Sequence, residues 1–287
     1  MHAVPRIDAH QHFWRFNAVE YAWIDDPMAA LRRDFLPGDL RPLLEAAGFD
    51  GCVAVQTRQS VEETAFLLRL ADAHPFVVGV VGWVDLQSAD VERQLEAAAR
   101  HPKLVGIRHI VQAEPDGFTR GPAFRRGIAA LQHFGLAYDI LIYARQLPEA
   151  IELAAAFPEQ RFVLDHLGKP DIRGHGFDPW RTNLDRIAAL PNVWAKLSGL
   201  VTEADWHRWT PETLQPYVAA AVDAFGANRL MIGSDWPVCT VAGDYATVMQ
   251  IVRDAIDDRP AAERDAIFGG TACRFWYLRV PSVGLGS

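Results

Sequence analysis

Short apolar runs recur along the chain at a regular spacing, and each is followed by a segment with helical periodicity. The runs are rich in β-branched residues and nearly continuous, as in parallel strands whose sheet is covered by helices. We expect eight strands, at about residues 6–10, 51–56, 77–85, 104–110, 137–143, 161–166, 192–197 and 230–235. We expect helices at about 39–47, 64–74, 89–100, 122–134, 147–156, 180–190, 214–225 and 244–257, with a short one near 261–268.

Local signals mark several of the expected helix ends. Ser60 followed by Glu63 predicts a capping box ahead of the helix at 64–74. Thr210-Pro211 predicts a cap and a first-turn proline, and Gly226 predicts the end of that helix. Asp178-Pro179 predicts the same kind of start for the helix at 180–190. The chain is therefore expected to alternate strand and helix eight times.

Eight strand–helix units predict a single (β/α)8 TIM barrel, because parallel strands covered by helices close most economically into that ring. A doubly wound open sheet is the alternative. We expect residues 1–280 to form the barrel as one domain and residues 281–287 to form a C-terminal tail.

Composition narrows the kinds of partner. The chain has 287 residues, half of them hydrophobic, and a formal net charge of −8 without any run of Lys or Arg. This balance indicates no nucleic-acid partner. The longest apolar stretch, residues 76–84, is too short to span a bilayer, so no membrane partner is expected either. The expected partner is a small molecule, and an oligomer is possible.

The cysteines and the start of the chain bear on the compartment. The three cysteines, at positions 52, 239 and 273, are an odd number without a C-x-x-C pair. They predict a reducing compartment and no disulfide framework. A strand signal within the first ten residues leaves no room for a secretory signal peptide. We therefore expect a cytoplasmic protein.

Two histidines stand at the end of the first expected strand. His10 and His12 are two residues apart, so their side chains point to the same side of an extended backbone. His166 ends the sixth expected strand and Asp235 ends the eighth. Catalytic groups of a barrel come from the C-terminal ends of its strands, and strands one and eight are neighbours in the ring. The four side chains should therefore meet in one site, suited to a metal ion or to proton transfer.

Each of these residues has a plainer interpretation when taken alone. The histidine pair could be ordinary polar residues at a strand end, and His166 could be a hydrogen-bonded core histidine. Asp235 could be the cap of a helix. Asp165 alternates with His166, so we expect it to face the helix layer as a structural residue.

Other strand ends carry candidates for substrate contacts. The polar and aromatic residues at these positions are Trp14, Trp23, Gln56, Arg108, His109, Tyr143, Lys196 and Trp236, and the tryptophans could equally be packing residues. Arg108 and Lys196 weigh most, because burying a cation without an oxygen-rich partner is costly. Lys196 could instead pair with Asp235 or another carboxylate inside the barrel. We expect a surface role for Arg145 and a packing role for Cys239.

Longer stretches around these residues resemble the amidohydrolase superfamily. They are Asp-Ala-His-Gln-His-Phe-Trp at 8–14, Gly-Ile-Arg-His at 106–109, Leu-Asp-His-Leu-Gly-Lys-Pro at 164–170, Lys-Leu-Ser-Gly at 196–199 and Gly-Ser-Asp-Trp-Pro at 233–237. Together they are similar to the sugar-acid lactonase branch, which includes fuconolactonases and rhamnonolactonases. The resemblance covers nearly the whole chain.

The resemblance implies hydrolysis of a sugar-acid lactone, such as L-fucono-1,5-lactone or a similar aldonolactone. On this hypothesis Asp235 is the general base that activates water, with His166 and Arg108 as further catalytic groups. His10, His12, His166 and Asp235 would hold one divalent metal, with zinc the first candidate, although some members of the branch work without a metal. Binuclear members carry a bridging lysine or glutamate where this chain has Arg108, and a fixed cation there disfavours a second metal ion.

Two other functions are compatible with the same barrel and the same set of residues. Some relatives are metal-dependent decarboxylases of aromatic or unsaturated acids, and they would use the same histidines and aspartate. A barrel that binds sugar acids without converting them is the non-enzymatic alternative. Acid released from a lactone faster than by spontaneous opening would indicate the lactonase. Carbon dioxide evolved from an aromatic acid would indicate the decarboxylase. Binding without either reaction would indicate the non-enzymatic barrel.

Overall fold

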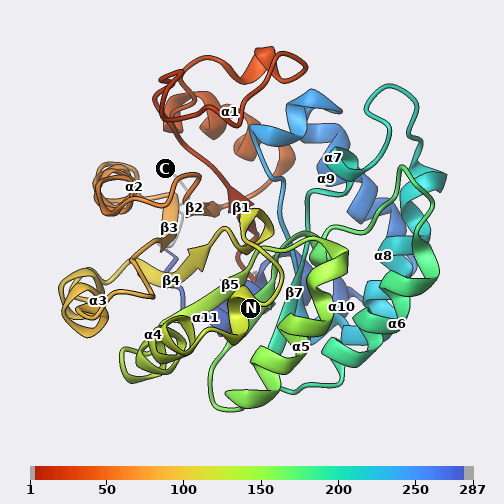
Figure 1. Cartoon of the computed structure of the whole chain (residues 1–287). Coiled ribbons are helices and arrows are strands. Elements are labelled where there is room, and N and C mark those ends of the chain that lie inside the picture. Colours follow the sequence, from red (N-terminus) through yellow and green to blue (C-terminus); the bar gives the residue numbers. More distant parts are fainter. Residues whose placement is uncertain (1–3, 281–287) are drawn as a thin grey trace.

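The strands of the protein lie in sequence order around a ring. The computed structural model describes residues 4–280, in which eight parallel strands follow one another (Figure 1). They are β1 (Ile7–Gln11), β2 (Gly51–Val55), β3 (Val77–Gly82), β4 (Leu104–His109), β5 (Ala137–Ile140), β6 (Phe162–Leu164), β7 (Val193–Leu197) and β8 (Leu230–Ile232). A bridge between Gln11 and Trp236 joins the last strand to the first. The predicted (β/α)8 barrel is confirmed, and the doubly wound sheet, which would place strands out of sequence order, is excluded.

Most helices form a layer outside the strands, whereas α11 (Thr271–Trp276) packs against the end of the barrel where the strands begin (Figure 1). The other helices are α1 (Pro37–Ala47), α2 (Val61–Ala73), α3 (Val91–Ala99), α4 (Pro122–His133), α5 (Leu147–Ala156), α6 (Phe177–Ala188), α7 (Leu200–Glu203), α8 (Pro211–Phe225), α9 (Tyr245–Ala255) and α10 (Ala261–Asp265). The expected helices are present with small shifts at their ends. The short helices α7 and α11 were not predicted, because four to six residues are too few to show a helical period. No helix within residues 4–280 is long and apolar enough to cross a membrane.

The predicted helix starts are correct in two of three cases. Ser60 Oγ accepts a hydrogen bond from the Glu63 amide at the start of α2, and α8 begins at Pro211 after Thr210. The Glu63 carboxylate does not complete the capping box, because it accepts bonds from the amides of Thr57 and Arg58. Helix α6 begins at Phe177, earlier than the Asp178-Pro179 signal predicted. The tail expected at 281–287 lies outside the described residues.

Hydrophobic side chains fill the interior of the barrel at the end where the strands begin. Ten come from the strands, and they pack against α11: Ile7, Ala9, Val53, Val55, Val78, Val81, Val105, Ala137, Val163 and Met231. Phe275 and Trp276 of α11 are buried in the same cluster. Arg161, just before β6, donates a hydrogen bond to the carbonyl oxygen of Phe275 and so fixes α11 at this end. We call this cluster the apolar floor.

Candidate active site

The two histidines of the β1 end lie in one buried cluster. The Nε2 atoms of His10 and His12 are 3.2 Å apart, and both side chains are buried. His12 Nδ1 lies 2.8 Å from the carbonyl oxygen of Val55, and because a carbonyl only accepts, Nδ1 must carry the proton. A neutral His12 therefore presents a free lone pair on Nε2 toward the centre of the cluster.

Asp235 reaches the same cluster from the segment after β8. Its amide donates to the carbonyl oxygen of His10 at 2.8 Å, which fixes it beside β1. Its Oδ1 atom lies 3.2 Å from Nε2 of His12. The other two histidine Nε2 atoms are at 3.7 Å (His10) and 3.9 Å (His166). Gly233 permits this approach, since a Cβ there would lie only 2.7 Å from the Cβ of His10.

His166 enters the cluster through a left-handed turn rather than from a strand. Strand β6 ends at Leu164, two residues earlier than predicted, and the turn η5 (Asp165–Gly168) follows. His166, Leu167 and Lys169 have φ angles of 53°, 53° and 50°. A non-glycine residue in this region costs roughly 1–2 kcal/mol, so three of them in one turn indicate that the position of their side chains matters.

The end of β7 holds the ring of His166 in place. Ser198 Oγ lies 2.9 Å from Nδ1 of His166. Gly199 follows, with φ at +65°, and a Cβ there would lie 2.4 Å from the same Nδ1 atom. The Ser-Gly pair after β7 therefore supplies both a hydrogen-bond partner and the space that the imidazole needs.

The donor atoms in this cluster fit a single divalent ion. Ligand atoms of His10, His166 and Asp235 lie within 4.8 Å of one another. The free Nε2 lone pair of His12 faces Asp235 Oδ1, so two acceptors stand 3.2 Å apart. Such a pair repels unless a proton or a metal ion lies between them. Imidazole nitrogens with one carboxylate oxygen are also a ligand set that suits zinc.

The protonation states favour the same interpretation. Burial lowers the pKa of His166 to about 4, although Asp235 and Asp165 oppose the shift. Burial alone would raise the pKa of Asp235, but the neighbouring side chains of His166, His12 and His10 hold it below its ordinary value. At neutral pH the site therefore combines a neutral imidazole at His166 with an ionised carboxylate at Asp235.

Buried charges form a layer directly beneath the histidines. Lys196 Nζ lies 2.5 Å from Asp139 Oδ2 and 2.8 Å from Asp165 Oδ1, and Arg108 Nη1 lies 2.9 Å from Asp165 Oδ2. All four side chains are buried. Lys196 Nζ is also 3.1 Å from Nδ1 of His10. We call Arg108, Asp139, Asp165 and Lys196 the charged layer.

The charged layer corrects two expectations. Asp165 points into the barrel and not toward the helices, because Val163 faces inward and alternation along β6 carries Asp165 to the same side. The turn that follows then brings His166 to the cluster as well. Lys196 is held by two carboxylates, as the alternative interpretation stated, and its position does not support a direct contact with substrate.

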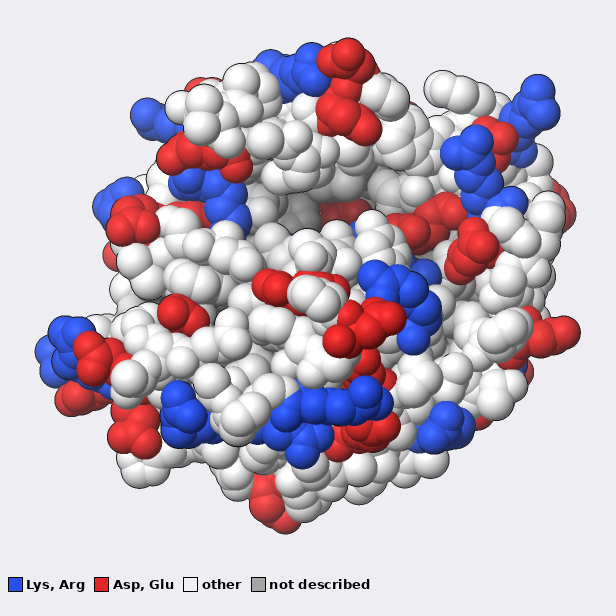
Figure 2. All heavy atoms as spheres, viewed as in Figure 1, with Lys and Arg blue, Asp and Glu red and all other residues white. Residues whose placement is uncertain are grey.

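A cavity of about 310 Å³ opens above the four clustered residues. Its lining combines His12, Arg108, His166 and Asp235 with residues of the surrounding loops: Trp23, Thr57, Ile110, Gln112, Ala113, Leu141, Lys169 and Val238. Figure 2 shows this face hollowed between the segment that joins β1 to α1 and the segments that follow β4 and β5. The cavity therefore gives a small molecule access to the histidines and to Asp235.

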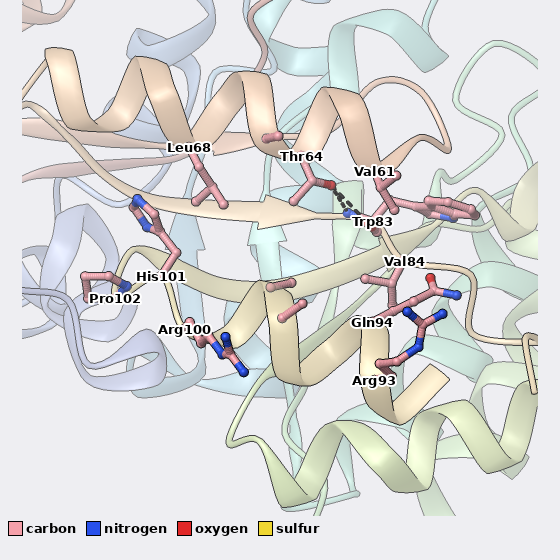
Figure 3. A pocket seen from close by; sticks show the side chains of 13 residues that line it. Val61, Thr64, Leu68, Trp83, Val84, Arg93, Gln94, Arg100, His101 and Pro102 are labelled. Carbon is pink, nitrogen blue, oxygen red and sulfur yellow. Dashed lines mark hydrogen bonds between the residues drawn. The ribbon is translucent and has the colours of Figure 1, made fainter. Parts of the chain in front are cut away.

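A larger groove, of about 630 Å³, lies outside the barrel between α2 and α3. In Figure 3, Leu68 of α2 points toward α3, and Arg93 and Arg100 border the groove. Its lining includes His101 but none of the four clustered residues. Size alone would select this groove, but the chemistry lies in the smaller cavity.

The sequence model of the amidohydrolase family matches residues 7–278. The chain belongs to the amidohydrolase family. The superfamily resemblance found in the sequence motifs is thereby confirmed, and the match extends from β1 to the residues just after α11.

Two similar proteins come from Burkholderia multivorans. A curated L-fucono-1,5-lactonase is 44% identical, over 96% of this chain and 97% of that protein. A crystal structure of an amidohydrolase with bound zinc superposes with a TM-score of 0.93 at 44% identity, covering 96% of this chain and all of that one. A 5-carboxyvanillate decarboxylase from Sphingomonas paucimobilis has a TM-score of 0.66 at 16% identity, over 96% of this chain and all of that one, and so shares the fold alone.

In this protein, most of the residues that the sequence suggested as substrate contacts do not line the cavity. Trp14 is fully buried, and its Nε1 donates to the carbonyl oxygen of Arg33 at 2.9 Å. Gln56 is also buried and accepts a hydrogen bond from Arg108. His109 Nε2 lies 2.8 Å from Glu114 Oε1. Among the described residues, the cavity lining includes none of Trp14, Gln56, His109, Tyr143 and Lys196.

The remaining candidate residues near the strand ends include one that lines the cavity and others that are buried or lie on the surface. Trp23 is 41% exposed and lines the cavity, whereas Trp236 is buried against Phe13 and Phe35. Arg145 forms an exposed ion pair with Asp116, which agrees with the surface role expected for it. Cys239 is buried, in agreement with its expected packing role.

Some lining residues had no signal in the sequence. Thr57 and Ile110 lie in loops, and Gln112 lies in a three-residue 3-10 helix (Val111–Ala113), and periodicity predicts neither kind of segment. Lys169 lies within the 164–170 stretch that resembles the family, but the periodicity of the sequence does not predict the left-handed turn that directs its side chain. A short His-x-x-Lys spacing after a strand was the only available pointer to it.

Proposed function

We propose that this amidohydrolase hydrolyses an aldonolactone to the open sugar acid, with L-fucono-1,5-lactone as the first substrate to test. The observation that carries the proposal is the ionised Asp235 carboxylate among three imidazoles at the base of a small, accessible cavity. Similarity to an L-fucono-1,5-lactonase over nearly the whole chain supports the choice of substrate.

In the proposed mechanism Asp235 accepts a proton from water, and the resulting hydroxide attacks the lactone carbonyl carbon. Negative charge then develops on the carbonyl oxygen, where Arg108 and the cluster of histidines supply positive or hydrogen-bonding partners. When the tetrahedral intermediate collapses, the ring C–O bond breaks. Protonated Asp235 returns its proton to the departing alkoxide, so the base is regenerated.

We further propose that His10, His12, His166 and Asp235 hold one divalent ion, with zinc as the candidate. Two observations support this choice: the structure of an amidohydrolase 44% identical to this chain contains bound zinc, and the donor atoms of the cluster fit such an ion. When bound, such an ion polarises the carbonyl and lowers the pKa of water. Metal analysis of the purified protein, followed by chelation, should show one equivalent of metal and a lower melting temperature after its removal, because a ligand of the folded state stabilises it. Unchanged melting after complete chelation would contradict the metal site.

Replacing Asp235 tests the mechanism. In the Asp235→Asn variant the amide can no longer accept a proton, so kcat/KM for L-fucono-1,5-lactone should fall by about 10²–10⁴-fold. Acid release is followed with an indicator in weak buffer, against spontaneous ring opening. Asp257→Asn, an exposed carboxylate paired with Arg264, is the matched control and should keep full activity. Full activity in a folded Asp235→Asn protein would remove Asp235 from the proposed role, and wild-type protein that releases no acid from any aldonolactone would refute the function.

A further inference from the structure

The left-handed turn after β6 directs a second side chain into the cavity. The Lys169 amide donates to the carbonyl oxygen of His166 at 2.9 Å, so the two residues are the first and last of a four-residue turn. Residues three apart in such a turn lie on the same side. Lys169 and His166 both line the cavity. The strained backbone therefore positions a cation as well as an imidazole.

Lys169 differs from the other cations near the cavity. Lys196 and Arg108 are bound to the buried carboxylates of the charged layer. Lys169 Nζ lies 3.4 Å from Glu203 Oε1, and both side chains retain some exposure, 16% and 19%. Strong charged hydrogen bonds are shorter, at about 2.7–2.9 Å. The loose pair leaves hydrogen-bonding capacity on both partners for a ligand.

Two neighbours set the position of the pair relative to the reaction centre. Lys169 Nζ lies 5.4 Å from the centre of the Tyr143 ring, which is 40% exposed at the rim. Glu203 ends α7, which packs against the segment Val238–Val241, and Val238 lines the cavity. The pair therefore lies at the side of the cavity, between α7 and the exposed rim at Tyr143.

We propose that Lys169 and Glu203 bind the ring hydroxyls of the substrate and determine the preference for hydroxylated lactones; this inference rests on the proposed function. An ammonium offers three donors and a carboxylate only acceptors, so together they can satisfy adjacent hydroxyls, each of which both donates and accepts. Much of the remaining wall is apolar, with Ile110, Leu141 and Val238. Few polar groups in an apolar pocket are what fixes the orientation of a ligand.

A comparison of two lactones tests the pair. δ-Valerolactone has the six-membered ring but no hydroxyls, whereas L-fucono-1,5-lactone carries them. Lys169→Met should lower kcat/KM for the fuconolactone by about 10- to 100-fold, the effect of losing a hydrogen bond to a charged group. The change should fall mainly on KM. For δ-valerolactone the same substitution should change kcat/KM by less than about threefold, the size of a weak contact.

Companion variants separate recognition from folding. Glu203→Gln should shift the preference in the same direction, and Lys169→Arg should restore part of it. Arg145→Met, which removes an exposed rim cation paired with Asp116, should leave both substrates unaffected. Equal losses on the two lactones in Lys169→Met would overturn the proposal, because they would place Lys169 at the reacting carbonyl or in the fold.

Binding of the open acids keeps the test independent of turnover. By calorimetry, Lys169→Met should weaken L-fuconate by at least about tenfold and leave 5-hydroxypentanoate unchanged. Equal affinities of wild type and variant for L-fuconate would refute the hydroxyl-binding role. If wild-type protein opens neither lactone, the proposed function fails, while this binding comparison still decides the role of the pair.

Discussion

The two halves of the barrel interior are built on different principles. The apolar floor consists of aliphatic strand residues packed on Phe275 and Trp276. The charged layer above it consists of Arg108, Asp139, Asp165 and Lys196, equally buried but held together by ion pairs. The two meet where the Lys196 ammonium lies 5.1 Å from the centre of the Trp276 ring.

The difference shows how a barrel separates stability from chemistry. Burying apolar surface stabilises the fold by about 25 cal/mol per Å² and tolerates small errors of position. A buried ion pair contributes little net stability, because desolvation offsets much of the attraction. The charged layer is therefore best explained by its position, directly against His10, where it fixes the residues of the site.

Removing the central cation should have the largest effect. Lys196→Met leaves Asp139 and Asp165 facing each other without their shared partner. Breaking such a buried pair costs about 3–5 kcal/mol, measured by urea unfolding, and lactone hydrolysis should fall with it. The double variant Lys196→Met with Asp139→Asn should lose less than the sum of the two single changes. Simple additivity would show that the charged layer does not act as a unit.

Opening the apolar floor should affect stability alone. Phe275→Ala removes a buried ring of α11 and should lower the free energy of unfolding by about 3 kcal/mol. At a temperature where the variant remains folded, kcat/KM should stay at the wild-type value, because the ring lies beneath the charged layer. A selective loss of activity in folded Phe275→Ala would contradict the separation of the two halves.

A smaller change tests whether Trp14 contributes to stability, like the apolar floor, or to substrate binding. Trp14→Phe removes the hydrogen bond to the carbonyl oxygen of Arg33 but keeps an aromatic ring in the core. We expect a loss of about 1 kcal/mol in stability and no change in KM. An increase in KM without loss of stability would return Trp14 to the substrate contacts that the sequence suggested.

The smallest effect is expected on the outer surface. Arg120 and Glu152 form an exposed ion pair, with N–O distances of 2.8 and 3.0 Å. Arg120→Ala should leave the melting temperature almost unchanged, since exposed ion pairs contribute little to stability. If Arg120→Ala lowered the melting temperature as much as Phe275→Ala, burial would not explain the stability that the apolar floor provides.

The order of the strands was predictable because each buried strand leaves a continuous apolar run. The meeting of His10, His12, His166 and Asp235 then followed from the closure of the ring. These inferences depend on periodicity and topology, which the sequence carries directly.

The facing of individual side chains near strand ends was not predictable. The apolar run predicts a strand through Asp165 and His166, which would place them on opposite faces, but β6 ends at Leu164. The left-handed turn breaks that alternation. Gly168 alone in this stretch favours positive φ strongly, whereas Leu167 and Lys169 adopt it at a cost, so the local pattern does not identify a turn of this length. Tertiary contacts such as that of His166 with Ser198 hold the turn, so it emerges only with the whole fold.

The seam between β1 and the segment after β8 has a consequence for biosynthesis. Asp8 accepts hydrogen bonds from the amide and hydroxyl of Ser234, and the Asp235 amide binds the His10 carbonyl. A ribosome needs roughly 10–45 s to travel from codon 10 to codon 235 at ordinary elongation speeds. Throughout that interval the first two imidazoles lack Asp235, the proposed general base, so the proposed hydrolysis requires translation past β8. The complete site therefore forms late in synthesis, when the segment after β8 makes its hydrogen bonds to β1.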